Sequence, residues 1–227
     1  MADIALGYGS EWQVLRFLGR HRAYLDRLIL ERVPGQRLEW LDFRFDQNPK
    51  ALTGDRELAA LEFLRADDPA RVAWREVWPT SGNPQNWDAV ALLDSRSWVL
   101  VEAKANLEEL GSSCGAKGGH SLQKIDTALC ATRDRLGASP AADWKTPYYQ
   151  YANRLVVLEH LLRHGHDVHL LNIYFCGDKS GPGRTCPKDE SGWVDVLARQ
   201  QQSLGLPDHH DLSDRVHRLF VEVRPIL

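Results

Sequence analysis

Three charged residues that could do chemistry together, Asp88, Glu102 and Lys104, lie at the ends of two apolar segments. The segments fall within residues 86–106 and flank a short polar break at residues 94–97. Apolar, β-prone segments around such a break predict a β-hairpin. A charge at the end of a buried strand is costly unless it is paired or coordinates a ligand. We therefore ask whether the three charges form one site.

The register of the hairpin decides whether they do. Glu102 and Lys104 are two apart on one strand, so their side chains leave the same face. A three-residue turn over residues 94–96 places Asp88 directly opposite Glu102. A turn of two or four residues would instead place Asp88 on the opposite face of the sheet.

Two carboxylates that face each other across a ladder repel. A hard divalent cation removes this conflict, and oxygen ligands on a rigid sheet suit Mg²⁺, which keeps waters for chemistry. Lys104 beside such a site could orient a metal-bound water or stabilise a developing negative charge. The residue types therefore indicate a metal site with bound water and a lysine beside it.

The remaining sequence predicts the elements that hold this hairpin. Ser10 and Gln13 have the pattern of a capping box, which starts a helix that ends before Pro34. Hydrophobic spacing then predicts, in order, a strand over 38–45, a helix over 55–65, a strand over 71–78, the hairpin, helices over 121–136 and 147–164, a strand over 168–175, a helix over 192–203 and a strand over 215–223. This order predicts a single α/β or α+β domain over residues 1–227, with helices around a mixed sheet.

The composition is that of an ordinary globular protein, with 43% hydrophobic and 26% charged residues. The net charge of −3 argues against binding of duplex nucleic acid through the overall charge of the protein, so such binding would need a local basic patch or a divalent metal. We find no apolar run of about 20 residues and no secretory signal pattern, and we expect a cytoplasmic protein without a membrane partner.

The cysteines and histidines do not indicate a metal site of their own. The four cysteines lack paired C-x-x-C spacing, so we expect reduced thiols. The histidines at 164, 166 and 169 and at 209–210 lack a ligand set at zinc-site spacing, and both groups are interpreted as polar loops.

The hairpin motif resembles the PD-(D/E)XK nuclease superfamily, in which an aspartate starts one strand and Glu-x-Lys closes the next. Asp88 and Glu102-Ala103-Lys104 match these positions, whereas Trp87 stands where the motif has proline. The predicted element order over about residues 55–177 is also similar to the family core of helix, three strands, helix and strand. The resemblance implies a restriction-endonuclease-like mixed β-sheet flanked by helices on both sides.

The resemblance also implies roles for these residues. Asp88 and Glu102, with the backbone carbonyl of Ala103, would hold Mg²⁺, for which Mn²⁺ is a possible substitute. Lys104 would act on the nucleophilic water. The implied activity is hydrolysis of phosphodiester bonds in nucleic acid, with DNA as the expected substrate.

Many family members add a helical glutamate before the sheet, and two residues compete for that role here. Glu62 lies four residues after Leu58, at the border of the apolar stripe of a predicted helix. Glu11 lies at the start of the first helix, where interaction with the helix dipole also accounts for it. The sequence leaves this choice open.

Some members carry a glutamine and a basic residue four positions later in the helix after the motif. Gln150 and Arg154 match this pattern, which implies that Gln150 lies near the metal and Arg154 toward a phosphate; a solvated helix face is the alternative. The glycine-rich loop over 111–120 could cradle a phosphate through backbone amides, Ser113 and Lys117, or be a flexible connection.

Two other functions remain open. The chain could keep a nuclease-like fold as a catalytically inactive module that binds nucleic acid or protein. It could also be an unrelated α/β enzyme in which Glu-x-Lys occurs by chance. A homo-oligomer is possible in each case.

Overall fold

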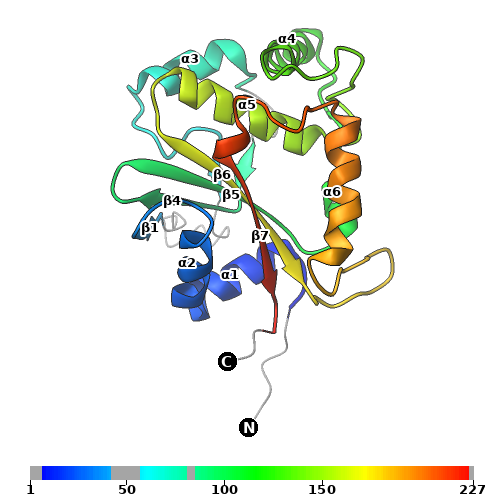
Figure 1. The fold of residues 1–227 in the computed structure, drawn as a ribbon. Coiled ribbons are helices and arrows are strands. Elements are labelled where there is room, and N and C mark those ends of the chain that lie inside the picture. Colours follow the sequence, from blue (N-terminus) through cyan, green and yellow to red (C-terminus); the bar gives the residue numbers. More distant parts are fainter. Residues whose placement is uncertain (1–6, 42–56, 81–84, 225–227) are drawn as a thin grey trace, which may run out of the picture.

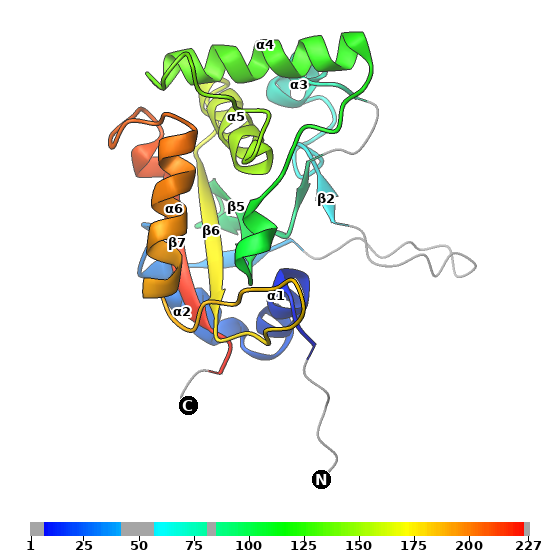
Figure 2. The ribbon, with the colours of Figure 1, turned by 90° about the vertical axis from the view of Figure 1, so that its right-hand side faces the viewer.

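A five-stranded mixed sheet forms the centre of the molecule, with helices on both faces (Figures 1 and 2). The computed structural model describes residues 7–41, 57–80 and 85–224. The strand order is β1 (Leu38–Trp40), β4 (Ala89–Leu93), β5 (Ser97–Lys104), β6 (Val168–Cys176) and β7 (Val216–Glu222). β1, β4 and β5 pair antiparallel, whereas β5, β6 and β7 pair parallel. The predicted α+β class with a mixed sheet is confirmed.

One face of the sheet is covered by α1 (Ser10–Arg20) and α2 (Arg22–Leu30). Phe17 of α1 is fully buried, and its ring centroid lies 5.4 Å from that of Phe175 on β6. Alternate residues of β5, such as Val99 and Val101, face this layer because successive side chains of a strand point to opposite faces.

The other face is covered by α5 (Tyr149–Arg163), with α3 (Pro69–Val77) and α4 (Gly119–Arg135) packed outside it (Figure 2). Residues 152–161 of α5 are all buried, since the helix lies between the sheet and the outer helices. α6 (Ser191–Ser203) packs beside it through Trp193, against Tyr174 of β6. Helices thus connect the parallel strands β5 and β6, as a parallel pair requires.

The β4–β5 hairpin has the register of the three-residue turn, one of the alternatives that the sequence left open. Leu93 pairs with Ser97, which leaves a three-residue turn, and the ladder runs to Ala89 opposite Val101. Asp94 and Ser95 adopt left-handed φ angles of 51° and 57° in this turn.

The N-terminal helix differs from the prediction. It breaks at His21 into α1 and α2, and its N-cap is Gly9, without a side-chain cap bond, so the capping box at Ser10 is wrong. Gln13 instead donates from Nε2 to Asp178 Oδ1 at 3.0 Å. Trp12 is 37% exposed because α1 turns its other side to the sheet.

Two predicted elements before the hairpin are also wrong. The expected helix over 55–65 is, in its described part, a short strand β2 (Leu58–Ala59), which pairs with β3 (Asn86–Trp87), followed by turns. The expected strand over 71–78 is helix α3, whose N-cap Asp68 accepts a hydrogen bond from the Ala70 amide at 2.9 Å. Asp-Pro at a helix start outweighs the β-prone composition that follows it.

These corrections move the first strand of the sheet to β1, which lies within the strand predicted over 38–45 but ends before Leu41. Residues 42–45 of that prediction lie outside the described residues. The sheet therefore draws on residues before the expected core of about 55–177. Two short 3₁₀ helices, η1 (Leu107–Leu110) and η2 (Ser213–Arg215), complete the described elements, and the other predicted helices and strands are present with slightly shifted ends.

Candidate functional site

Asp88 lies at a bend between β3 and β4, directly beyond the last pair of the hairpin ladder. Its Oδ2 accepts a hydrogen bond from the Ala103 amide at 2.7 Å. Because the N–H and C=O of one strand residue point to the same side, the carbonyl of Ala103 is also directed toward β4 and Asp88. Asp88 and both backbone groups of Ala103 therefore meet at the end of the hairpin.

Glu102 is the centre of a buried ion network. Its side chain is 5% exposed, and its Oε1 accepts from Nζ of Lys104. Its Oε2 lies 2.7 Å from both Nε and Nη2 of Arg154 on α5. One carboxylate is thus held by two cations, one from its own strand and one from the covering helix.

Gln150, at the start of α5, connects that helix to the lysine. Its Oε1 accepts from Nζ of Lys104 at 2.9 Å, and its backbone amide donates to Ser112 Oγ at 2.7 Å. Gln150 thus lies beside the Glu-x-Lys motif and not on a solvated helix face, and its position near a metal stays a prediction.

Arg154 is placed differently from its expected contact with a phosphate. It is 2% exposed, and its guanidinium lies 4.5 Å from the ring centroid of Trp87. It also donates to the carbonyl of Asn86 and to Asn153 Oδ1. The guanidinium is buried because α5 lies directly on the sheet, so Arg154 positions Glu102 rather than reaching solvent.

The two carboxylates have opposite pKa shifts. Burial, together with the nearby charge of Glu102, raises the pKa of Asp88 to about 7, although Lys104 and the Ala103 amide act in the other direction. Burial would also raise the pKa of Glu102, but the charges of Arg154 and Lys104 outweigh it and hold this pKa below its usual range. At neutral pH, Asp88 is therefore partly protonated, whereas Glu102 carries its full negative charge.

Glu57 is a further acidic residue at this site that the sequence interpretation missed. Burial raises the pKa of Glu57, and the charges of Glu11 and Glu102 raise it further, whereas a hydrogen bond with Asn86 lowers it. Its charge also raises the pKa of Asp88. The spacing of the motif does not indicate Glu57, because its hydrogen bond with Asn86 depends on the pairing of β2 with β3.

The two glutamates considered from sequence lie in different surroundings. Glu11 is exposed on α1, near enough to Glu57 to affect its pKa. Glu62 follows β2, and its Oε2 accepts from the Ala59 amide at 3.1 Å in the turn. Glu11 thus belongs to the acidic surroundings of Glu57.

The oxygen atoms at this end of the hairpin are of the kind that a hard divalent cation prefers. Asp88, Glu102 and the Ala103 carbonyl would supply the donors, although Lys104 and Arg154 already contact the two oxygens of Glu102. Among the described residues, no three acidic, histidine or cysteine side chains form a metal-binding group by themselves. A cation here would therefore need the Ala103 carbonyl and water as additional ligands.

The glycine-rich loop after β5 does not bring its predicted side chains to this network. Ser113 is exposed, and its hydroxyl lies 2.9 Å from that of Thr146. Lys117 is exposed near the start of α4. The residue of this loop that touches the site is Ser112, through Gln150.

The histidine interpretation needs one correction. His169 is not in a polar loop but on β6, where its Nδ1 lies 2.9 Å from Nε2 of His217. His166 pairs with Asp68 at 3.1 Å. The four cysteines are free thiols.

No protein-family model, curated protein or solved structure matches this chain. Among the described residues, no helix has both the length and the apolar character needed to cross a membrane.

Proposed function

We propose that this protein is a metal-dependent nuclease that hydrolyses phosphodiester bonds in nucleic acid, with DNA as the expected substrate. The observation that carries the proposal is the convergence of Asp88, Glu102, Lys104 and Gln150 at the end of one hairpin. The antiparallel β1–β4–β5 unit followed by a helical crossover to parallel β6 also supports a restriction-endonuclease-like arrangement.

In this proposal each residue has a distinct role. Asp88, Glu102 and the Ala103 carbonyl would hold the cation, which would supply positive charge to polarise water and the phosphate. Lys104 orients water or stabilises negative charge on the phosphate, while Gln150 holds its ammonium group at 2.9 Å. Arg154 is a positioning residue, because its contacts are with Glu102 and the hairpin.

The test is incubation of the purified protein with single-stranded, linear and supercoiled DNA and with RNA, in Mg²⁺ or Mn²⁺. We expect cleavage that EDTA stops and that Glu102→Gln and Lys104→Ala each reduce by at least about 100-fold, the scale seen when a transition-state contact is removed. Lys188→Ala, at an exposed lysine outside the network and outside the glycine-rich loop, is the matched control. Cleavage that persists in both variants would contradict the proposed site.

A second candidate function is a catalytically inactive nuclease-like fold that binds nucleic acid or protein. The observation that favours it is the neutralisation of Glu102 by both Lys104 and Arg154, since a paired carboxylate has less need of a cation. Nucleic-acid binding without cleavage in any metal, retained in Glu102→Gln and Lys104→Ala, would support this function over the first.

A further inference from the structure

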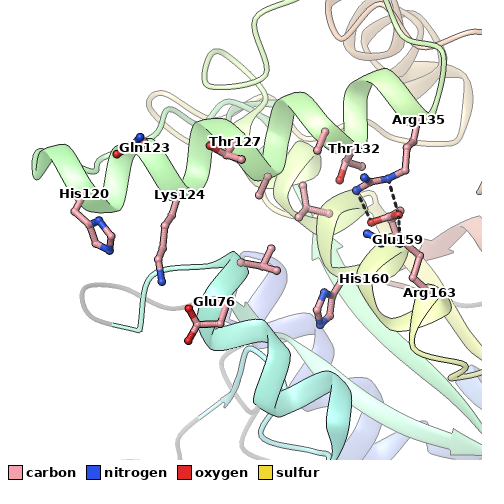
Figure 3. Close-up of a pocket in the computed structure, with 14 residues that line it drawn as sticks. Glu76, His120, Gln123, Lys124, Thr127, Thr132, Arg135, Glu159, His160 and Arg163 are labelled. Carbon is pink, nitrogen blue, oxygen red and sulfur yellow. Dashed lines mark hydrogen bonds and ion pairs between the residues drawn. The ribbon is translucent and has the colours of Figure 1, made fainter.

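A separate pocket of about 480 Å³ lies between α3, α4 and α5 (Figure 3). Val156 and His160 of α5 line it, whereas Gln150 and Arg154 of the same helix contact β5 residues. The pocket is therefore distinct from the candidate active site. Its volume falls within the range of about 300–1,000 Å³ that is typical of small-molecule sites.

Part of the pocket surface is apolar and made of small side chains. Val77 of α3, Ala128 and Ala131 of α4 and Val156 of α5 line this part. Short side chains on facing helices leave room for a bulky apolar group, and a planar ring would cover them with little loss of its own conformational freedom.

The hydroxyl of Thr132 supplies an independent indication of a ligand. Thr132 lines the pocket and is fully buried, and its Oγ1 has no hydrogen-bond partner among the described residues. Buried polar atoms are nearly always hydrogen-bonded, so an unpartnered one beside a cavity is expected to meet a polar atom of a ligand or a water.

One end of the pocket carries excess positive charge. Nε and Nη2 of Arg135 contact Glu159 at 2.7 and 2.9 Å, and Nε of Arg163 lies 3.5 Å from the same carboxylate (Figure 3). Two guanidinium groups thus share one carboxylate. Their side chains are 41% and 60% exposed, which leaves donors accessible to an anion at the rim.

We propose that this pocket binds a small heteroaromatic anion, which consists of a planar ring and a phosphate or carboxylate group. The ring would lie on the small apolar side chains, and a ring heteroatom or substituent would hydrogen-bond to Thr132. The anionic group would contact Arg135 and Arg163. This site goes beyond the proposed nuclease function and does not rest on it.

Calorimetric titration of the full chain with four probes tests the ligand class. AMP combines a ring with a phosphate, nicotinate combines a ring with a carboxylate, and adenosine and inorganic phosphate each lack one part. We expect AMP or nicotinate to bind at least tenfold more tightly than both adenosine and phosphate, and the better of the two identifies the anionic group. Absence of this preference would overturn the proposal.

Two variants test whether the ligand binds in this pocket. Thr132→Val removes the hydroxyl at nearly constant volume, and Arg163→Gln removes one exposed cation; each should weaken binding by about tenfold. Arg37→Gln, which changes a 75% exposed arginine beside β1, is the control and should bind as the wild type does. Unchanged affinity in both pocket variants, with melting curves showing that they are folded, would overturn the proposal.

Discussion

At the scale of single residues, the two carboxylates of the site differ in how far nearby positive groups balance their negative charge. Glu102 has two cationic partners, whereas Asp88 has a backbone amide and acidic neighbours. A buried carboxyl of this kind favours its protonated form. Its raised pKa has a direct consequence for stability.

In metal-free buffer, Asp88 lowers stability at high pH. Its pKa is about 7 in the folded protein and near 3.8 when unfolded, so the folded state binds more protons between these values. The stabilising contribution of the protonated group is complete below about pH 3.8 and is lost as the pH rises through about 7, which costs at most about 4 kcal/mol at 1.36 kcal/mol per pKa unit. We expect Asp88→Asn, which keeps the acceptor for the Ala103 amide, to be more stable than the wild type at pH 8.

Urea unfolding at pH 5 and pH 8 in EDTA measures this difference. The advantage of Asp88→Asn over the wild type should be larger at pH 8 than at pH 5. Added Mg²⁺ at pH 8 should raise the unfolding free energy of the wild type but not of Asp88→Asn, because the variant lacks the ligand charge. An advantage that is equal at both pH values would contradict the raised pKa.

At the scale of elements, Arg154 joins α5 to the hairpin and to β3. Its guanidinium contacts Glu102, the carbonyl of Asn86 and the ring of Trp87. The sequence predicted both this helix and the hairpin, but not that they would enclose the arginine. The contact fixes the end of the hairpin where Asp88 lies.

We expect Arg154→Met to destabilise the protein by about 3–5 kcal/mol, because it leaves the buried Glu102 carboxylate with Lys104 alone. Chemical denaturation measures the change. Arg37→Met, at an exposed pair with Glu39, is the control and should cost no more than about 1 kcal/mol. If Glu102→Gln is combined with Arg154→Met, the loss should be smaller than the sum of the two single losses. Strict additivity would argue against the buried pair.

At the scale of the whole molecule, α1 and α2 belong to the same folding unit as the candidate site. They cover the face of the sheet opposite α5, and Phe17 is buried against Phe175 of β6 (Figure 1). A chain whose two layers share one sheet should unfold in a single transition.

Phe17→Ala should therefore lower the global free energy of unfolding by about 3–5 kcal/mol, the usual cost of emptying a core aromatic position. Tryptophan fluorescence and far-UV circular dichroism should shift together. Trp12→Ala changes a 37% exposed residue of the same helix and should cost much less. Separate transitions for the two signals would show that the N-terminal helices fold independently.

The sequence by itself determined the hairpin and the shared face of Glu102 and Lys104, because both depend on local alternation along the strands. It left the length of the turn open, and the structure decided for the three-residue turn that brings Asp88 to Glu102. The sequence also determined the mixed sheet and most of the helices, because the hydrophobic periodicity of each helix or strand lies within one segment of the chain.

Only the tertiary structure decided what surrounds these residues. Residues 71–77 have a composition that favours a strand, but they are helical, and the buried face of this helix packs on α5. Glu57 enters the site through β2, and Arg154 is buried because α5 lies on the sheet. Such contacts join segments that are far apart in the chain. Their free energy depends on the tertiary packing, which a pattern within one segment does not show.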